Sequence, residues 1–282
     1  MTINQHFVTL LAKLTPSSAE NAAYSSLRNS VEAKLNSTFN VTFTFETGSF
    51  RSGTGVRYNT DLDILVSIPA AYQRDNSYNM LLAIKTALEE KFWSSNIYIR
   101  TPSVVCAFSD NKTLEITPGY YQRQEQDLWN VYKIPDFGGG WQIAAPSAHI
   151  AYVNMVNNKL DKKVKHVIRL IKAIKYVRNI PISSFYLELR IAKYCDGEKT
   201  ISYEHDVYIV LNRLVNDGLA NMRDPMGISG YIEPTSTDVQ KADALSKLTT
   251  ARNRAGWAID AQKAGNHVEA LNWWSKVFGR DF

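Results

Sequence analysis

The chain of 282 residues lacks the features that mark secreted, membrane-spanning and zinc-binding proteins. Its two cysteines, Cys106 and Cys195, lie far apart, which excludes a disulfide framework and predicts reduced, buried thiols. Its five histidines are scattered without the spacing of metal ligands, so no zinc site is expected. No run of about 18 apolar residues occurs, so the sequence indicates no membrane span.

The chain also lacks internal repeats, low-complexity segments and, at residues 1–6, the basic and apolar regions of a signal peptide. A cytoplasmic location is therefore expected. A hydrophobic content of 45% with 21% charged residues is ordinary for a globular protein, and the length suffices for two lobes. The net charge of +5 suits a protein with polyanionic substrates, although many basic proteins bind no nucleic acid.

The most informative segment combines a glycine-serine turn, at Gly48 and Ser49, with two acids on a following strand. Strand side chains alternate between faces, so Asp61 and Asp63 project together, ahead of the apolar run 64–68. Two such acids can hold a divalent metal or a pair of them, and a metal pair can clamp the attacking and leaving oxygens of a nucleotidyl transfer. The turn offers backbone N–H groups and the Ser49 hydroxyl to phosphate oxygens. Each half alone is common, but the ordered combination indicates a nucleotidyltransferase.

This combination resembles the polymerase-beta-like nucleotidyltransferase superfamily, which includes CCA-adding enzymes, oligoadenylate synthetases and bacterial cyclic-oligonucleotide synthases. The resemblance implies Mg²⁺ or Mn²⁺, as two ions, and a third carboxylate on a neighbouring strand. Glu115 is the candidate, because it alternates with Leu114 and Ile116 and so faces away from them. The family more often has Asp here, and Glu115 could instead be a solvent-facing strand residue. Asp110, in the preceding turn, is the alternative third acid.

The second half of the chain is expected to be helical, beginning at Pro146. A helix over about 162–177 has one apolar face and, on the other, a basic stripe of Lys165, Arg169 and Lys172. For Lys165 and Arg169 the stripe predicts a solvated surface. Lys172 is a phosphate-binding candidate because of the segment that follows the helix.

That segment, residues 182–188, has the sequence I-S-S-F-Y-L-E. The lysine-bearing helix followed by this segment resembles the second lobe of cyclic GMP-AMP synthase-like and oligoadenylate synthetase-like enzymes. The resemblance implies that Lys172 and Ser184 contact the donor triphosphate and that Phe185 stacks on the donor base. Alternatively, Ser184 is only a helix N-cap and Phe185 only a core residue. Lys175, one turn after Lys172, is a second phosphate candidate.

The predicted fold class is α+β: a two-lobed polymerase-beta-like nucleotidyltransferase, with a mixed-sheet lobe, a helical lobe and the active site in the cleft. Residues 1–140 are expected to form the catalytic lobe, including an N-terminal helix over about 18–36. Residues 141–282 are expected to form the helical lobe that binds the donor nucleotide. The boundary is placed at the three successive glycines in residues 136–141, since such a run breaks helices and strands.

Residues 223–225 and the ending 273–282 extend the resemblance to bacterial cyclic GMP-AMP synthase-like enzymes, the CD-NTase family. This implies a synthase that joins ribonucleoside triphosphates into a cyclic di- or trinucleotide in anti-phage (CBASS) signalling. The implied partners are the triphosphates, a regulatory protein and an effector encoded nearby. No membrane partner is expected, and the sequence requires no nucleic-acid activator. A nucleotidyltransferase that modifies an antibiotic or an RNA end is the alternative.

Overall fold

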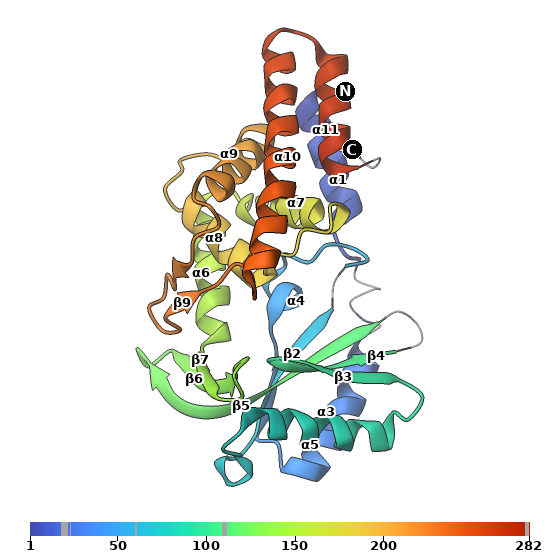
Figure 1. Ribbon diagram of the computed structural model, residues 1–282, viewed down its shortest axis with the longest axis vertical. Coiled ribbons are helices and arrows are strands. Elements are labelled where there is room, and N and C mark those ends of the chain that lie inside the picture. The colour runs from blue at the N-terminus through green and yellow to red at the C-terminus, as the bar shows by residue number, and fades with distance from the viewer. Residues whose placement is uncertain (18–21, 23, 60, 109–111, 280–281) are drawn as a thin grey trace. The chain divides into compact units, whose positions relative to one another are not determined.

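The computed structural model describes residues 1–17, 22, 24–59, 61–108, 112–279 and 282, which form two compact units. The sheet unit comprises residues 16–53 and 60–150, and the helical unit comprises residues 1–15, 54–59 and 151–282. Figure 1 traces the elements of both along the chain, from blue at the N-terminus to red at the C-terminus.

The sheet unit is built on a seven-stranded mixed sheet. Its main path has the order β1-β2-β5-β4-β3, and β6 and β7 continue from β5. β2 and β5 are parallel, whereas the other strand pairs are antiparallel. The strands are β1 (Phe43–Glu46), β2 (Leu62–Ser67), β3 (Asn96–Arg100), β4 (Ser103–Ala107), β5 (Thr113–Glu125), β6 (Trp129–Pro135) and β7 (Trp141–Ala144).

Two helices, α3 (Ser25–Phe39) and α5 (Ser77–Lys91), cover one face of this sheet (Figure 1). Their apolar side chains share a core with alternate residues of β2, β4 and β5, which is the period-2 pattern of a sheet with one buried face. A short helix α4 (Gly48–Ser52) and a 3₁₀ turn at Ala70–Tyr72 complete the unit. The core residues include Val31, Leu35, Leu62, Ile64, Val66, Met80, Ile84, Leu88, Val104, Cys106, Leu114 and Ile116.

The helical unit consists mainly of helices, together with a two-stranded ribbon. Its elements are α1 (Ile3–Leu14), α7 (Val164–Val177), α8 (Ser184–Cys195), α9 (Tyr203–Asn216), β8 (Met222–Arg223), β9 (Tyr231–Ile232), α10 (Asp238–Lys263) and α11 (His267–Phe278). α6 (Pro146–Lys159) begins at the predicted residue and leads from the sheet unit into the helical unit. None of the helices in the described ranges is long and apolar enough to cross a membrane.

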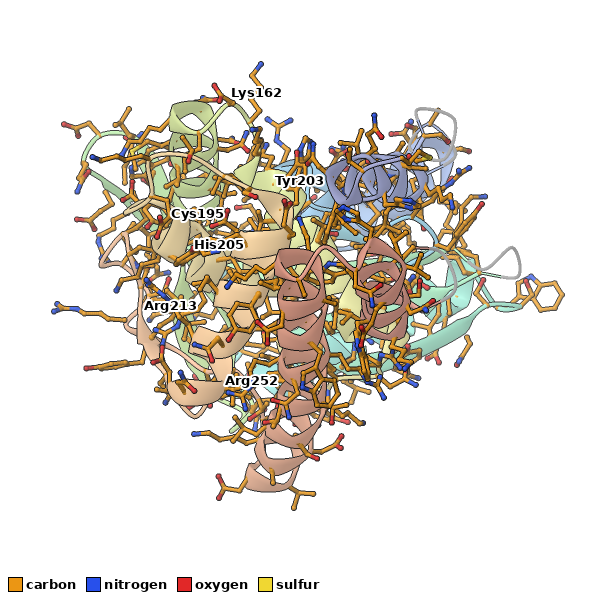
Figure 2. The ribbon with its side chains drawn as sticks, turned by 90° about the horizontal axis from the view of Figure 1, so that it is seen from above. Lys162, Cys195, Tyr203, His205, Arg213 and Arg252 are labelled. Carbon is orange, nitrogen blue, oxygen red and sulfur yellow. The ribbon has the colours of Figure 1, made fainter. Side chains whose placement is uncertain are left out.

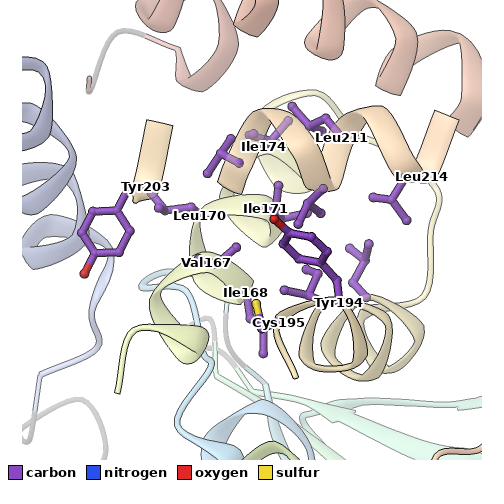
Figure 3. Close-up of a cluster of buried hydrophobic side chains, with 14 of the residues drawn as sticks. Val167, Ile168, Leu170, Ile171, Ile174, Tyr194, Cys195, Tyr203, Leu211 and Leu214 are labelled. Carbon is purple, nitrogen blue, oxygen red and sulfur yellow. The ribbon is translucent and has the colours of Figure 1, made fainter. Parts of the chain in front are cut away.

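α7 lies in the centre of the helical core, where its predicted apolar face packs against α8 and α9 (Figure 3). Cys195 is part of this cluster, and both cysteines are buried and free, as predicted. The predicted solvated stripe is wrong for Arg169, which is only 7% exposed. Its Nε donates a hydrogen bond of 2.8 Å to the carbonyl of Gly55, so the helix is buried on its basic side as well. Exposed cations lie elsewhere, for example Arg213 on α9 (Figure 2).

The first helix, α1, belongs to the helical unit, which differs from the predicted division at residue 140. Thr2 and Gln5 form a capping box at its start. Its Phe7 is fully buried in an aromatic cluster, with ring centroids 5.0 Å from Trp274 and 5.6 Å from Phe278 of α11. The burial of this ring ties the N-terminal helix to the C-terminal one, a pairing that local sequence patterns do not specify.

The glycine run does not form the crossing between the units. Residues 136–140 connect β6 to β7 within the sheet unit, and the Asp136 carboxylate accepts hydrogen bonds from the amides of Gly138 and Gly140. The chain instead makes its last passage from the sheet unit to the helical unit within α6, between Ile150 and Ala151. The predicted helix over 18–36 overlaps α3, which begins at Ser25.

Candidate active site

The parallel pairing of β2 and β5 brings the predicted acids onto one face of the sheet. Asp63 is in register with Glu115, and Asp61 lies two residues before Asp63, next to the start of β2. The flanking residues Leu62 and Ile64 point into the core beneath α3 and α5, so Asp63 points to the opposite face. The sequence predicted this alternation for each strand, and the register adds that the acids are neighbours.

Asp61 and Glu115 interact directly with each other and with Arg100, the last residue of β3. The Arg100 guanidinium forms an ion pair with Oε1 of Glu115, and its Nη2 lies 3.7 Å from Oδ2 of Asp61. Arg100 was not predicted from the sequence, because it lies near Glu115 only through the pairing of β3 with β4 and of β4 with β5.

The environment of Glu115 raises the pKa of its carboxyl group above the ordinary value. Burial is the largest cause, because it disfavours the charged form, and the neighbouring charge of Asp61 acts in the same direction. The Arg100 guanidinium opposes both effects. A carboxylate held in this way is more basic than a solvated one, which suits a group that accepts a proton.

Gly48 lies directly against the Asp63 carboxylate. A Cβ atom at this position would be 1.9 Å from Oδ2 of Asp63, and the backbone has φ +58. The amide of Thr47 donates a 2.8 Å hydrogen bond to the carbonyl of Asp63, which fixes the segment beside β2. The predicted glycine-serine turn is instead a short helix, α4, with Ser49 half-buried in its first turn. Only glycine allows this approach of the backbone to the carboxylate.

Gly48→Ala is therefore expected to abolish most activity by displacing Asp63. The added methyl group cannot occupy the position of Oδ2, so the carboxylate or α4 must move. Gly218→Ala is the matched control, because Gly218 also has φ +58 but a Cβ there meets nothing within 4 Å. Both variants are expected to lose about 1–2 kcal/mol of stability from the left-handed backbone. Turnover assays and thermal unfolding of both would test this; equal activities would contradict it.

The donor set fits a divalent cation in its chemistry, since Mg²⁺ and Mn²⁺ prefer carboxylate oxygens. The oxygens of Asp61 and Glu115 already face a cationic group, the Arg100 guanidinium. Among the described residues, however, no three His, Cys, Asp or Glu side chains are grouped closely enough to hold a metal ion. Asp63 lies against Gly48, whereas Asp61 and Glu115 are paired with Arg100. Asp110, the alternative third acid, falls outside the described residues.

In the helical unit, Ser184 is the first residue of α8 and accepts a 2.6 Å hydrogen bond from Nζ of Lys175. The N-cap is Ser183, whose hydroxyl accepts from the amide of Tyr186. The alternative prediction that Ser184 is only the N-cap of this helix is therefore wrong. Phe185 is 43% exposed, so it is not a core residue either. A lysine, a hydroxyl and the positive end of a helix dipole together favour phosphate binding.

Lys172 does not share this exposed position. Its side chain is 1% exposed, and Nζ forms a 2.8 Å ion pair with Oε1 of Glu188. The same carboxylate oxygen accepts a 2.6 Å hydrogen bond from Thr54. The predicted contact between Lys172 and a triphosphate disagrees with this burial, because the ammonium is enclosed and neutralised inside the helical unit. Lys175, the second candidate, is the lysine beside Ser184.

A family model described as the Second Messenger Oligonucleotide or Dinucleotide Synthetase domain matches residues 1–157. The chain belongs to this family. The matched segment contains every described residue of the acid site, from Gly48 through Arg100 to Glu115. The predicted membership of the cyclic-oligonucleotide synthase branch is therefore confirmed.

Two curated proteins are similar to this chain. A "probable cyclic nucleotide synthase" of Bacillus cereus (strain VD146) is 25% identical over 217 residues, which are 73% of this chain and 63% of that protein. The match thus spans less than two thirds of this relative's length. A "cyclic AMP-AMP-AMP synthase" of an Acinetobacter species is 24% identical over 309 aligned positions, which cover 100% of this chain and 86% of the relative.

Solved structures share the fold over the whole chain. CdnC of E. coli MS115-1, determined with ATP, superposes with a TM-score of 0.77 at 17% identity and covers 99% of this chain and 98% of its own. The same protein in a complex with HORMA-deltaN gives a TM-score of 0.76. The predicted α+β class and polymerase-beta-like nucleotidyltransferase fold are confirmed by these superpositions.

Proposed function

We propose that this protein is a metal-dependent nucleotidyltransferase that joins ribonucleoside triphosphates into a cyclic di- or trinucleotide. The observation that carries the proposal is the acid arrangement: Asp63 is in register with Glu115, Asp61 and Glu115 both face Arg100, and Gly48 lies against Asp63. The printed names of the two curated relatives, a cyclic nucleotide synthase and a cyclic AMP-AMP-AMP synthase, support the product class.

The reaction transfers a nucleotidyl group to a ribose hydroxyl. The hydroxyl oxygen attacks the α-phosphorus of a triphosphate, the bond to the β-phosphate oxygen breaks, and pyrophosphate leaves. Asp61, Asp63 and Glu115 would hold Mg²⁺ or Mn²⁺, which when bound supplies positive charge for the transferring phosphate. Glu115 would also accept the proton of the attacking hydroxyl. The last transfer, from the free hydroxyl of the linear intermediate to its own 5′-triphosphate, releases another pyrophosphate and closes the ring; a dinucleotide needs two transfers in all and a trinucleotide three.

The helical unit supplies groups for the donor nucleotide. Lys175 and Ser184, 2.6 Å apart at the start of α8, bind triphosphate oxygens, and the exposed ring of Phe185 stacks on the donor base. In this proposal Lys172 has a structural role, since its ammonium group forms an ion pair with Glu188. Gly48 and Ser49 contribute backbone amides and a hydroxyl to phosphate in the sheet unit.

The product test uses purified protein, α-labelled ribonucleoside triphosphates singly and mixed, and Mg²⁺ or Mn²⁺. We expect pyrophosphate release and a labelled product that resists phosphatase, because a ring has no terminal phosphate. Mass spectrometry should then give the mass of two or three nucleotides without a triphosphate. Omission of the divalent metal should prevent product formation.

Two other outcomes would contradict ring formation. Transfer of a nucleotide to an added aminoglycoside, or steady growth of long linear chains on an RNA end, would favour the alternative function. An anti-phage role with a regulatory partner and a neighbouring effector is part of the proposal. The structure of CdnC with HORMA-deltaN supports testing for such a partner by co-purification with the neighbouring gene products.

A further inference from the structure

Arg100 is the charged group nearest to the acid pair that the proposed reaction does not use. It ends β3, and its guanidinium is paired with Glu115 and lies 3.7 Å from Asp61. β3 is the last strand on the main path of the sheet, so the side chain must extend across β4 to meet Glu115 on β5. The long, planar arginine side chain suits this reach and can address two carboxylates.

The strand registers put Arg100 on the same face as the acids. Tyr98 is opposite Val105, Val105 is opposite Glu115, and Glu115 is opposite Asp63, so these four residues share one row. Arg100 is two residues after Tyr98 and therefore points to the same side. Its side chain is 54% exposed, so the guanidinium can move away without disturbing the core.

The guanidinium and a divalent cation need the same oxygens. Arg100 donates to Oε1 of Glu115, so the guanidinium and a cation are attracted by the same negative charge. In addition, two cations within a few ångströms repel each other. A metal ion that binds Asp61 and Glu115 must therefore displace Arg100 or bind against its charge.

We propose that Arg100 is a resident counter-ion of Asp61 and Glu115 which a divalent cation displaces, so that Arg100 sets the metal concentration at which the site fills. This rests on the proposed function, in which these acids are the metal ligands. In this role Arg100 is a positioning residue, because its contacts orient both carboxylates. Its positive charge also repels an incoming cation and so weakens the binding of that cation.

The test measures Mn²⁺ affinity directly by electron paramagnetic resonance of free Mn²⁺, without nucleotide. Arg100→Gln and Arg100→Met are each expected to lower the dissociation constant about fivefold, the size expected for the loss of a partly exposed ion pair. Arg100→Lys keeps the positive charge and should remain close to wild type. Arg123→Gln is the matched control, because Arg123 is also 54% exposed and paired with a glutamate, 3.0 Å away, further along β5.

The outcomes separate this proposal from the function on which it rests. Unchanged or weaker Mn²⁺ binding in both neutral Arg100 variants, each shown by circular dichroism to be folded, would overturn the role of Arg100. An equal rise in Mn²⁺ affinity in Arg123→Gln would also overturn the role of Arg100, since the effect would then come from the net charge of the protein. If Asp61→Asn binds Mn²⁺ as tightly as wild type, the acids are not the metal ligands and the proposed function itself fails.

Discussion

Asp61→Asn and Asp63→Asn are each expected to remove nearly all turnover while the protein stays folded. An amide is neutral and coordinates a divalent cation poorly, so either change weakens the site that carries the transferring phosphate. The loss should be at least about tenfold at saturating magnesium, since even indirect supports of a metal site are worth about 10–100-fold. Initial rates of pyrophosphate release would measure it.

Asp75→Asn serves as the control for this pair. Asp75 is exposed in the same unit, and the substitution removes the same charge away from the acid site. Its turnover should match wild type. Activity above about a tenth of wild type in either Asp61→Asn or Asp63→Asn would refute the assignment of the catalytic acids.

Lys172→Met is expected to lower the free energy of unfolding by about 3 kcal/mol or more, since it removes the cation from the buried ion pair with Glu188. Lys175→Ala should leave stability nearly unchanged, because this lysine, in the last turn of α7, is only half-buried. It should instead raise the KM for triphosphate by loss of a charge-assisted phosphate contact. The two lysines are one helical turn apart and so form a matched pair.

Chemical denaturation separates the structural and the substrate-binding interpretation of Lys172. The double variant Lys172→Met with Glu188→Leu should recover much of the lost stability, because apolar residues can replace a buried ion pair at little cost. If Lys172→Met is as stable as wild type and raises only the KM for triphosphate, the ion pair with Glu188 does not stabilise the fold. Lys172 would then contact the donor triphosphate, as the sequence predicted.

Local sequence patterns were enough to predict which face of each strand carries the acidic side chains. Asp61 and Asp63 share a face, and Glu115 opposes Leu114 and Ile116, because side-chain alternation depends only on neighbours along one strand. The same reasoning predicted the apolar face of α7, since helical periodicity is equally local. The order of the glycine-serine segment and the acids was enough to indicate the nucleotidyltransferase fold.

Tertiary structure alone decided which of these residues meet. The register that sets Asp63 opposite Glu115 joins segments far apart in the chain, and the pairing of β3 with β4 and of β4 with β5 brings Arg100 to Asp61 and Glu115. Likewise, only the packing of α7 against α8, with Thr54 on the Glu188 carboxylate, buries Lys172 and leaves Lys175 beside Ser184. The burial of a side chain and the pairing of strands depend on other segments of the chain. No periodic pattern within one helix or strand therefore predicts them.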